Sequence, residues 1–154
     1  MHEKANIKHP LGLEMGHRET TCGSCAWSRY RGPGPKVLRC GAAFNRRVKA
    51  IWQGCVNWET TLNCLDCAAC CGPAYDVVEV SRTDPVRKKQ ADWIEQIDGR
   101  YQVLRRSDNH CRALLADNRC QIYVDRPRCC RAFERGEENC LFARRRLGFT
   151  KPWR

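Results

Sequence analysis

Residues 64–71 read CLDCAACC, four cysteines in the spacing Cys-x2-Cys-x2-Cys-Cys. Two intervening residues allow one tight turn to aim both sulfurs at a single metal centre, and turns in series deliver most of a four-thiolate shell. Further cysteines lie on both sides of this stretch, and the 154 residues contain thirteen in all. The chain is also polar for its size, so metal–ligand bonds would add substantially to its folding free energy.

The cysteine density alone fits either a disulfide scaffold or metal sites. A secreted protein would begin with a basic stretch, an apolar run and a cleavage site, and residues 1–20 contain no apolar run. No stretch is long enough to span a membrane. We therefore expect a cytoplasmic protein whose thiols stay reduced and serve metal chemistry. The odd number of cysteines agrees, since thirteen cannot all pair.

The second half of the chain extends the cysteine pattern. Residues 111–114 read CRAL, residues 120–132 read CQIYVDRPRCCRA, and Cys140 follows. With residues 64–71, these motifs resemble the YkgJ-type cysteine-cluster family, also described as a zinc- or iron-chelating domain, over roughly residues 64–140. The resemblance implies eight metal ligands: Cys64, Cys67, Cys70, Cys71, Cys111, Cys120, Cys130 and Cys140. Cys129 lies outside the pattern and is expected to be a spare thiol, either inert or reactive.

The identity of the metal is open between iron and zinc. The 64–71 run is close to the CxxCxxC of bacterial ferredoxins, although Cys71 directly follows Cys70 where those proteins place a cysteine three residues on. This run favours iron–sulfur clusters, of the 4Fe-4S type. The alternative is structural zinc, the commonest occupant of closed thiolate sites. The YkgJ-type family is described with both metals, so the resemblance implies ligands more than function.

A separate set of cysteines lies in residues 21–59. Their spacing is Cys-x2-Cys-x14-Cys-x14-Cys, which predicts a second metal module. With the segment Gly54-Cys55-Val-Asn-Trp58, this spacing resembles high-potential iron–sulfur proteins and the small cluster-bearing subunits of some glycyl-radical enzymes. Five aromatic residues in the stretch either shield a cluster from water or form the core of the module. The expected ligands are Cys22, Cys25, Cys40 and Cys55.

The expected architecture is a small, irregular α+β metalloprotein with two cysteine-rich modules, short strands and one main amphipathic helix. The parts are a polar N-terminal arm (1–20), a four-cysteine metal module (21–59), a CxxCxxCC cysteine-cluster domain (60–145) and a basic tail (146–154). The helix is predicted over residues 81–99, capped by Ser81 or Asp84 and ended by Gly99. Strands are predicted near 74–80 and 100–106, a hairpin turning at 116–119, and a short helix at 127–135. The RGPGPK stretch at 31–36 must be a loop.

The formal charge of +11 first indicates nucleic acid as a partner. Zinc(II) or an oxidised four-iron cluster on four thiolates carries a net charge of −2, so three such sites leave about +5. That excess suits docking to an acidic partner protein. The arginines of 126–135 and 144–146 have little aromatic interleaving, so nucleic-acid binding is not favoured. No membrane partner is expected.

Other candidate groups are few. His110 abuts Cys111 and could replace a thiolate, while His2, His9 and His17 in the arm could bind adventitious metal. No Ser/His/acid set, phosphate-binding loop or paired carboxylates indicate catalysis.

The sequence thus predicts a non-catalytic iron–sulfur protein, an electron-transfer or accessory subunit of a larger enzyme system. The alternative is a zinc-stapled interaction protein whose basic surface contacts nucleic acid. A third hypothesis, an enzyme that uses a labile cluster or Cys129, is the weakest, because no base or substrate pocket is apparent.

Overall fold

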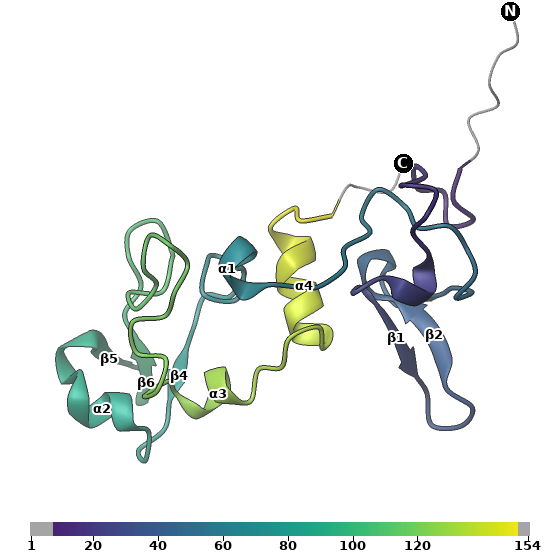
Figure 1. The fold of residues 1–154 in the computed structure, drawn as a ribbon. Coiled ribbons are helices and arrows are strands. Elements are labelled where there is room, and N and C mark those ends of the chain that lie inside the picture. The colour runs from purple at the N-terminus through teal and green to yellow at the C-terminus, as the bar shows by residue number, and fades with distance from the viewer. Residues whose placement is uncertain (1–7, 151–154) are drawn as a thin grey trace, which may run out of the picture. The chain divides into compact units, whose positions relative to one another are not determined.

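The computed structural model of the chain describes residues 8–150 and divides the protein into two compact units (Figure 1). Among the described residues, unit 1 comprises 8–62 with 148–150, and unit 2 comprises Asn63–Leu147. The structure is α+β, with two small sheets and short helices. In the described part of the chain, every helix is too short or too polar to cross a bilayer.

Unit 1 is built on one antiparallel sheet in the order β1-β2-β3, formed by Ser28–Arg31, Val37–Cys40 and Arg46–Arg47. The predicted loop at 31–36 is confirmed as the hairpin connection between β1 and β2. Two 3-10 helices, η1 (Cys22–Ser24) and η2 (Gly41–Ala43), flank the sheet. Trp27 is completely buried, and its ring nitrogen donates to Oε1 of Glu59 at 2.8 Å.

Residues 8–16 differ from the expected polar arm. Leu11 and Leu13 are buried, so two apolar side chains outweigh their polar neighbours. The segment is tied to the last cysteine of the unit by a bridge between Met15 and Cys55 and by the bond from the Gly16 amide to the Gly54 carbonyl, at 2.8 Å. This part of the arm therefore belongs to the folded module. Residues 1–7, with His2, lie outside the described residues.

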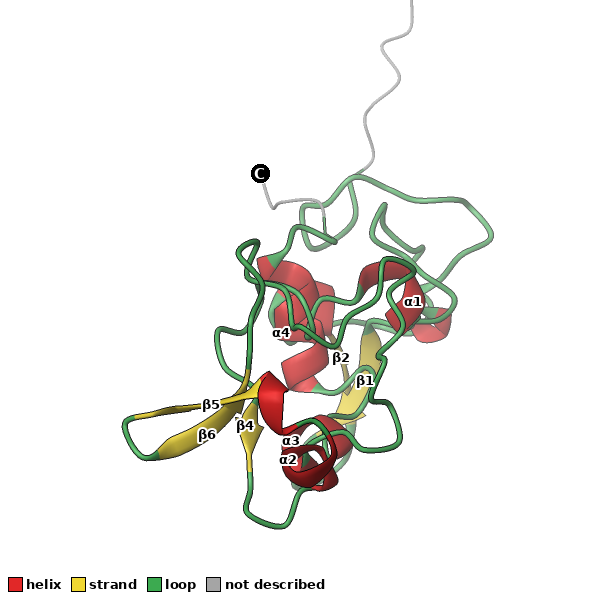
Figure 2. Cartoon of the chain, turned by 90° about the vertical axis from the view of Figure 1, so that its left-hand side faces the viewer, coloured by secondary structure: helices red, strands yellow, loops and turns green. Residues whose placement is uncertain are grey.

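Unit 2 holds a second antiparallel sheet, in the order β4-β6-β5, beside short helices (Figure 2). The strands are β4 (Glu79–Val80), β5 (Ile94–Ile97) and β6 (Arg100–Val103). The helices are α1 (Cys64–Cys67), α2 (Pro85–Lys89), the 3-10 turn η3 (Ala91–Trp93), α3 (Arg128–Arg131) and α4 (Glu138–Arg146).

The predicted amphipathic helix over 81–99 begins as expected but is wrong beyond Lys89. Asp84 is the N-cap and Pro85 occupies the first turn of α2. The chain then turns and forms β5, because Asp98 and Gly99 both take positive φ values, 49° and 77°, which suit a tight hairpin into β6. Gly99 thus makes a hairpin turn rather than a helix end.

Two other predictions for unit 2 were incomplete. Residues 121–125 form turns, so the hairpin expected around 116–119 is reduced to one bridge between Leu114 and Cys120, closed by the Leu115 amide, which donates to the Arg119 carbonyl at 2.8 Å. The nine-residue helix α4 falls in a stretch for which no helix was expected. It begins with an acidic residue and ends with three arginines, which complements the helix dipole.

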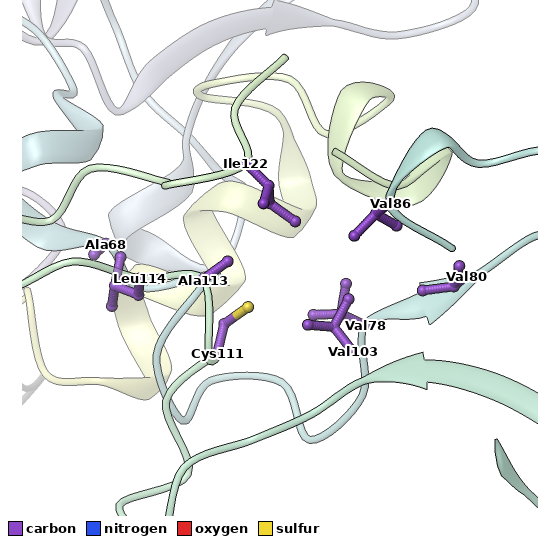
Figure 3. Close-up of a cluster of buried hydrophobic side chains, with 9 residues drawn as sticks. All are labelled: Ala68, Val78, Val80, Val86, Val103, Cys111, Ala113, Leu114 and Ile122. Carbon is purple, nitrogen blue, oxygen red and sulfur yellow. The ribbon is translucent and has the colours of Figure 1, made fainter. Parts of the chain in front are cut away.

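The core of unit 2 includes two clusters of buried side chains. The larger cluster joins the sheet, α2 and the 111–122 segment (Figure 3). Its members are Ala68, Val78, Val80, Val86, Val103, Cys111, Ala113, Leu114 and Ile122. The smaller joins the 68–75 turns to α4 through Ala69, Ala74 and Ala143. Both clusters are small, so bonds to metal would contribute a large share of the stability.

Candidate metal centres

All thirteen cysteines lie within residues 8–150 and carry free thiols, the state that a metal ligand requires. Within residues 8–150, no group of three or more His, Cys, Asp or Glu side chains already has the arrangement that would hold a metal ion. The thiols nevertheless lie in groups. Thiolates repel one another only when they are close, so cysteines that raise each other's pKa values are neighbours.

The four cysteines of unit 1 form one group. Burial is the main cause that raises the pKa of Cys22 from 9.0 to about 12, and repulsion from Cys40, Cys25 and Cys55 adds to it. Burial likewise raises the pKa of Cys40 to about 11, with additions from Cys25 and Cys55. The structure therefore brings together the four residues that the spacing predicted as one module, from η1, the end of β2 and the loop at 55.

A second group lies beside the smaller core cluster of unit 2. Burial raises the pKa of Cys64, and repulsion from Cys70, Cys140 and Cys67 raises it further. The first two cysteines of the group bound α1, where the side chain of Asn63 caps the Leu65 amide at 3.1 Å. Cys140 comes from α4, which the Tyr75 hydroxyl holds by donating to the Asn139 carbonyl at 2.8 Å.

A third group lies at the larger core cluster. Cys111 belongs to that cluster, and Figure 3 shows its sulfur pointing into the space among the surrounding side chains. Cys71, Cys120 and Cys130 pack against the same cluster. The Cys111 amide donates to the Cys71 carbonyl at 2.7 Å, which joins the 64–71 run to the 111–120 segment. Repulsion from Cys111 adds to the raised pKa values of all three.

The two groups of unit 2 meet at Cys70 and Cys71. Their sulfurs lie 4.0 Å apart, and a hydrogen bond from Cys71 lowers the pKa of Cys70 to about 7. Cys70 interacts with members of both groups, whereas Cys71 interacts with Cys111 and Cys130. Cys70 therefore adjoins both groups, which comprise Cys64, Cys67 and Cys140 on one side and Cys71, Cys111, Cys120 and Cys130 on the other.

A recurring turn places a backbone N–H donor beside the cysteine sulfur, where it stabilises negative charge. The backbone N–H two residues after the cysteine donates to the sulfur, which partly offsets the effect of burial on the thiol pKa. Such donors stabilise a metal-bound thiolate in the same way, so the turns fit a metal site. The pairs are Cys25 with Trp27, Cys40 with Ala42, Cys55 with Asn57, Cys111 with Ala113, and Cys120 with Ile122.

Arginines lie beside the thiols of unit 2. The Arg105 guanidinium donates to the carbonyls of Cys71 and Gly72, at 3.3 and 3.1 Å, and so fixes the end of the CxxCxxCC run. Arg144, only 3% exposed, follows Cys140 by one turn of α4, and its charge partly offsets the burial that raises the pKa of that thiol. Positive charge at these places suits a centre with a net charge of −2.

Cys129, His110 and His9 are candidates from the sequence that lie outside these groups. Cys129 is exposed; its sulfur donates to the Glu79 carbonyl at 3.2 Å and lies 3.9 Å from that of Cys130. His110 directs Nδ1 toward Asp108, 3.2 Å from its Oδ1. His9, expected to be an arm residue, is instead 2% exposed with Nε2 3.2 Å from the Cys22 sulfur. Burial lowers the pKa of His9. The apolar pattern Leu11-x-Leu13 was the available signal for this packing.

The family model described as "CxxCxxCC: Putative zinc- or iron-chelating domain" matches residues 63–146. The chain belongs to this family. The match confirms the resemblance drawn from the 64–71 run and shows a metal-binding cysteine-cluster domain, with boundaries close to those of unit 2. The description of the CxxCxxCC family names zinc and iron alike. No curated protein and no solved structure matches the chain. Unit 1 lies outside the matched residues, so its resemblance to high-potential iron–sulfur proteins stays a prediction.

Proposed function

We propose that the chain is an iron–sulfur protein, with 4Fe-4S clusters, that serves as an electron-transfer or accessory subunit of a larger enzyme system. The observation that carries this proposal is the Cys70–Cys71 pair, whose sulfurs lie 4.0 Å apart, with Cys70 also near Cys64 and Cys71 near Cys111 and Cys130. Structural zinc sites can act as staples independently of one another, whereas electron transfer needs centres that lie close together. Two sites in direct contact favour a function that passes electrons between them.

In unit 2 we assign the groups to two sets of four cysteines: Cys64, Cys67, Cys70 and Cys140 in one, and Cys71, Cys111, Cys120 and Cys130 in the other. In unit 1 the residues that would hold the group are Cys22, Cys25, Cys40 and Cys55. An iron–sulfur cluster supplies reversible one-electron chemistry when bound. The protein contributes thiolates, backbone N–H donors that stabilise negative charge on sulfur, and apolar cover from its core clusters.

The proposed partner is a larger protein with an acidic docking surface. With three anionic centres the chain keeps a net charge of about +5. Several arginines of 126–145 are occupied within the chain, since Arg131 pairs with Asp84 and Arg145 with Glu138, at 3.3 and 2.8 Å. Exposed Arg146 leaves basic charge at the surface for association with an acidic partner.

The test is the metal content of protein made without oxygen. We expect brown protein with iron and acid-labile sulfide, about four irons for each set of four cysteines. Colourless protein with stoichiometric zinc would overturn the proposal and establish the zinc-binding alternative.

Neighbouring cysteines provide matched variants for this measurement. Cys130→Ser is expected to lose about one third of the iron, whereas Cys129→Ser keeps all of it, although the two residues are adjacent. Cys70→Ser and Cys71→Ser are each expected to lose one centre, and the double variant two. Equal iron loss from Cys129→Ser and Cys130→Ser would contradict the division of ligands.

A further inference from the structure

The ring of His9 is held by two hydrogen bonds in unit 1. Its Nδ1 accepts from the Leu11 amide at 3.1 Å, and its Nε2 lies 3.2 Å from the sulfur of Cys22. The ring of Trp52 meets it edge-on, with ring centroids 5.8 Å apart and an interplanar angle of 86°. With 2% exposure, the imidazole has a fixed position rather than a choice of rotamers.

These contacts fix the position of the ring proton. A backbone N–H can only donate, so Nδ1 must present its lone pair to Leu11. The neutral imidazole then carries its proton on Nε2, the atom that faces Cys22. With that proton in place, Nε2 has no lone pair for a metal, so His9 acts as a donor to a ligand sulfur and not as a ligand.

The other three sulfurs of the group obtain comparable donors from the backbone. The amides of Glu59 and Trp27 donate to Cys25, those of Ala43 and Ala42 to Cys40, and that of Asn57 to Cys55. Cys22 stands at the start of η1, and the donor that reaches its sulfur is the side chain of His9. The histidine therefore completes the set of N–H donors around the four thiols.

We propose that His9 is a positioning residue for the unit 1 metal centre, whose Nε2–H stabilises the metal-bound thiolate of Cys22. This inference depends on the proposed metal binding by Cys22, Cys25, Cys40 and Cys55. A donor to sulfur withdraws charge from it, so the bond makes Cys22 less nucleophilic and, with iron bound, raises the reduction potential of the centre. The bond also links the 8–16 segment to the metal site.

The test measures alkylation of each cysteine in the metal-loaded full chain by mass spectrometry, together with metal content. In His9→Phe the ring is kept without its donor, and we expect Cys22 to be alkylated about tenfold faster, the effect of losing one hydrogen bond to a charged group. His9→Gln, which retains an N–H at a similar reach, is expected to restore much of the protection. His17→Phe changes an exposed histidine of the same segment and serves as the control.

A second readout uses cobalt(II) in place of the native metal. His9→Phe is expected to shift the sulfur-to-cobalt charge-transfer band to lower energy, since the sulfur gains electron density, while His9→Gln leaves it near the wild-type position. A general loosening of the fold would not distinguish the two variants in this way.

The outcomes separate the inference from the metal proposal. If Cys22→Ser leaves the metal content of the chain unchanged, unit 1 holds no metal and both proposals fail for this unit. If metal is present but His9→Phe changes Cys22 alkylation by less than about twofold, the role of His9 is overturned and the metal centre stands. The same holds if His9→Gln behaves like His9→Phe.

Discussion

At the scale of single residues, Asp84 joins two parts of unit 2 that are far apart in the sequence. It is 2% exposed and its carboxylate accepts from the amides of Ser81 and Arg128, at 2.8 and 2.9 Å, and from the Arg131 guanidinium at 3.3 Å. Burial alone would raise its pKa, but the Ser81, Arg128 and Arg131 contacts outweigh burial and lower it. The residue thereby holds α2 and α3 together.

Replacement of Asp84 by Asn is expected to destabilise the metal-loaded protein by roughly 2 kcal/mol, because charged hydrogen bonds are lost in a buried place. Because the folded pKa lies below the unfolded 3.8, the contribution of the carboxylate is present above that value and disappears as the pH falls through the folded pKa. Urea unfolding at neutral and acidic pH measures both effects. Asp92→Asn, at an exposed position, is the control and should change little.

Residue-level prediction was strongest where spacing carried the information. The twelve cysteines that spacing and the family resemblance singled out all fall into the three groups of neighbouring thiols. The contact of His9 with Cys22 was missed, because the two residues are thirteen positions apart and the spacing of the cysteines does not encode it; the Leu11-x-Leu13 pattern signalled only that this segment packs. The division of eight cysteines into sets of four also depends on contacts between distant segments, which spacing does not encode.

At the scale of elements, the β5–β6 hairpin shows how a two-residue turn overrides a helical pattern. Val86, Trp93, Ile94 and Ile97 fit a helix face, and the sequence favoured one. The positive φ values of Asp98 and Gly99 instead fold the chain back on itself. The Asp-Gly pair is a known hairpin signal and was the available clue.

Gly99→Ala is expected to destabilise unit 2 by about 1 kcal/mol. A Cβ there would meet open space, so the whole cost comes from holding a non-glycine residue at φ +77°. Gly34→Ala is a matched control, since its Cβ also meets open space and its φ is not in the left-handed region. Thermal unfolding of both variants provides the measurement. Equal decreases in melting temperature would contradict the explanation from the positive φ of Gly99.

Helix α4 offers a second test at this scale through Arg144 and Arg146. Arg144→Gln is expected to weaken metal binding at the set that contains Cys140 about tenfold, because a buried positive charge beside an anionic centre is lost. Arg146→Gln removes an equal charge from an exposed position of the same helix and should have little effect. Competition with a chromophoric chelator provides the affinities.

At the scale of the whole molecule, metal and protons compete for the same sulfurs. In the metal-free chain burial raises the pKa of most of the thiols above the ordinary 9.0, to about 12 for Cys22 and about 11 for Cys40. Between those values the folded state holds more protons than the unfolded state, so its stability falls as the pH rises. In the loaded chain the sulfurs are already ionised, and stability falls instead on acidification as protons displace metal.

The metal-free and the metal-loaded protein are therefore expected to lose stability at opposite ends of the pH range. Metal-free protein should melt at progressively lower temperature as the pH rises above about 9, while loaded protein holds its melting temperature there and loses both metal and structure in acid. Thermal melts followed by circular dichroism across the pH range, with metal release measured in parallel, provide the check. Identical profiles for the two forms would count against metal binding by these thiols.

The turn at 115–119 has a consequence for proteolysis. Each set of four cysteines in unit 2 draws members from both sides of this turn: Cys140 lies beyond it in one set, and Cys120 and Cys130 in the other. Arg119 is exposed, so trypsin could cut the chain after it. The two fragments would stay joined through both inorganic centres, and would separate on a sizing column only after a chelator had extracted the metal.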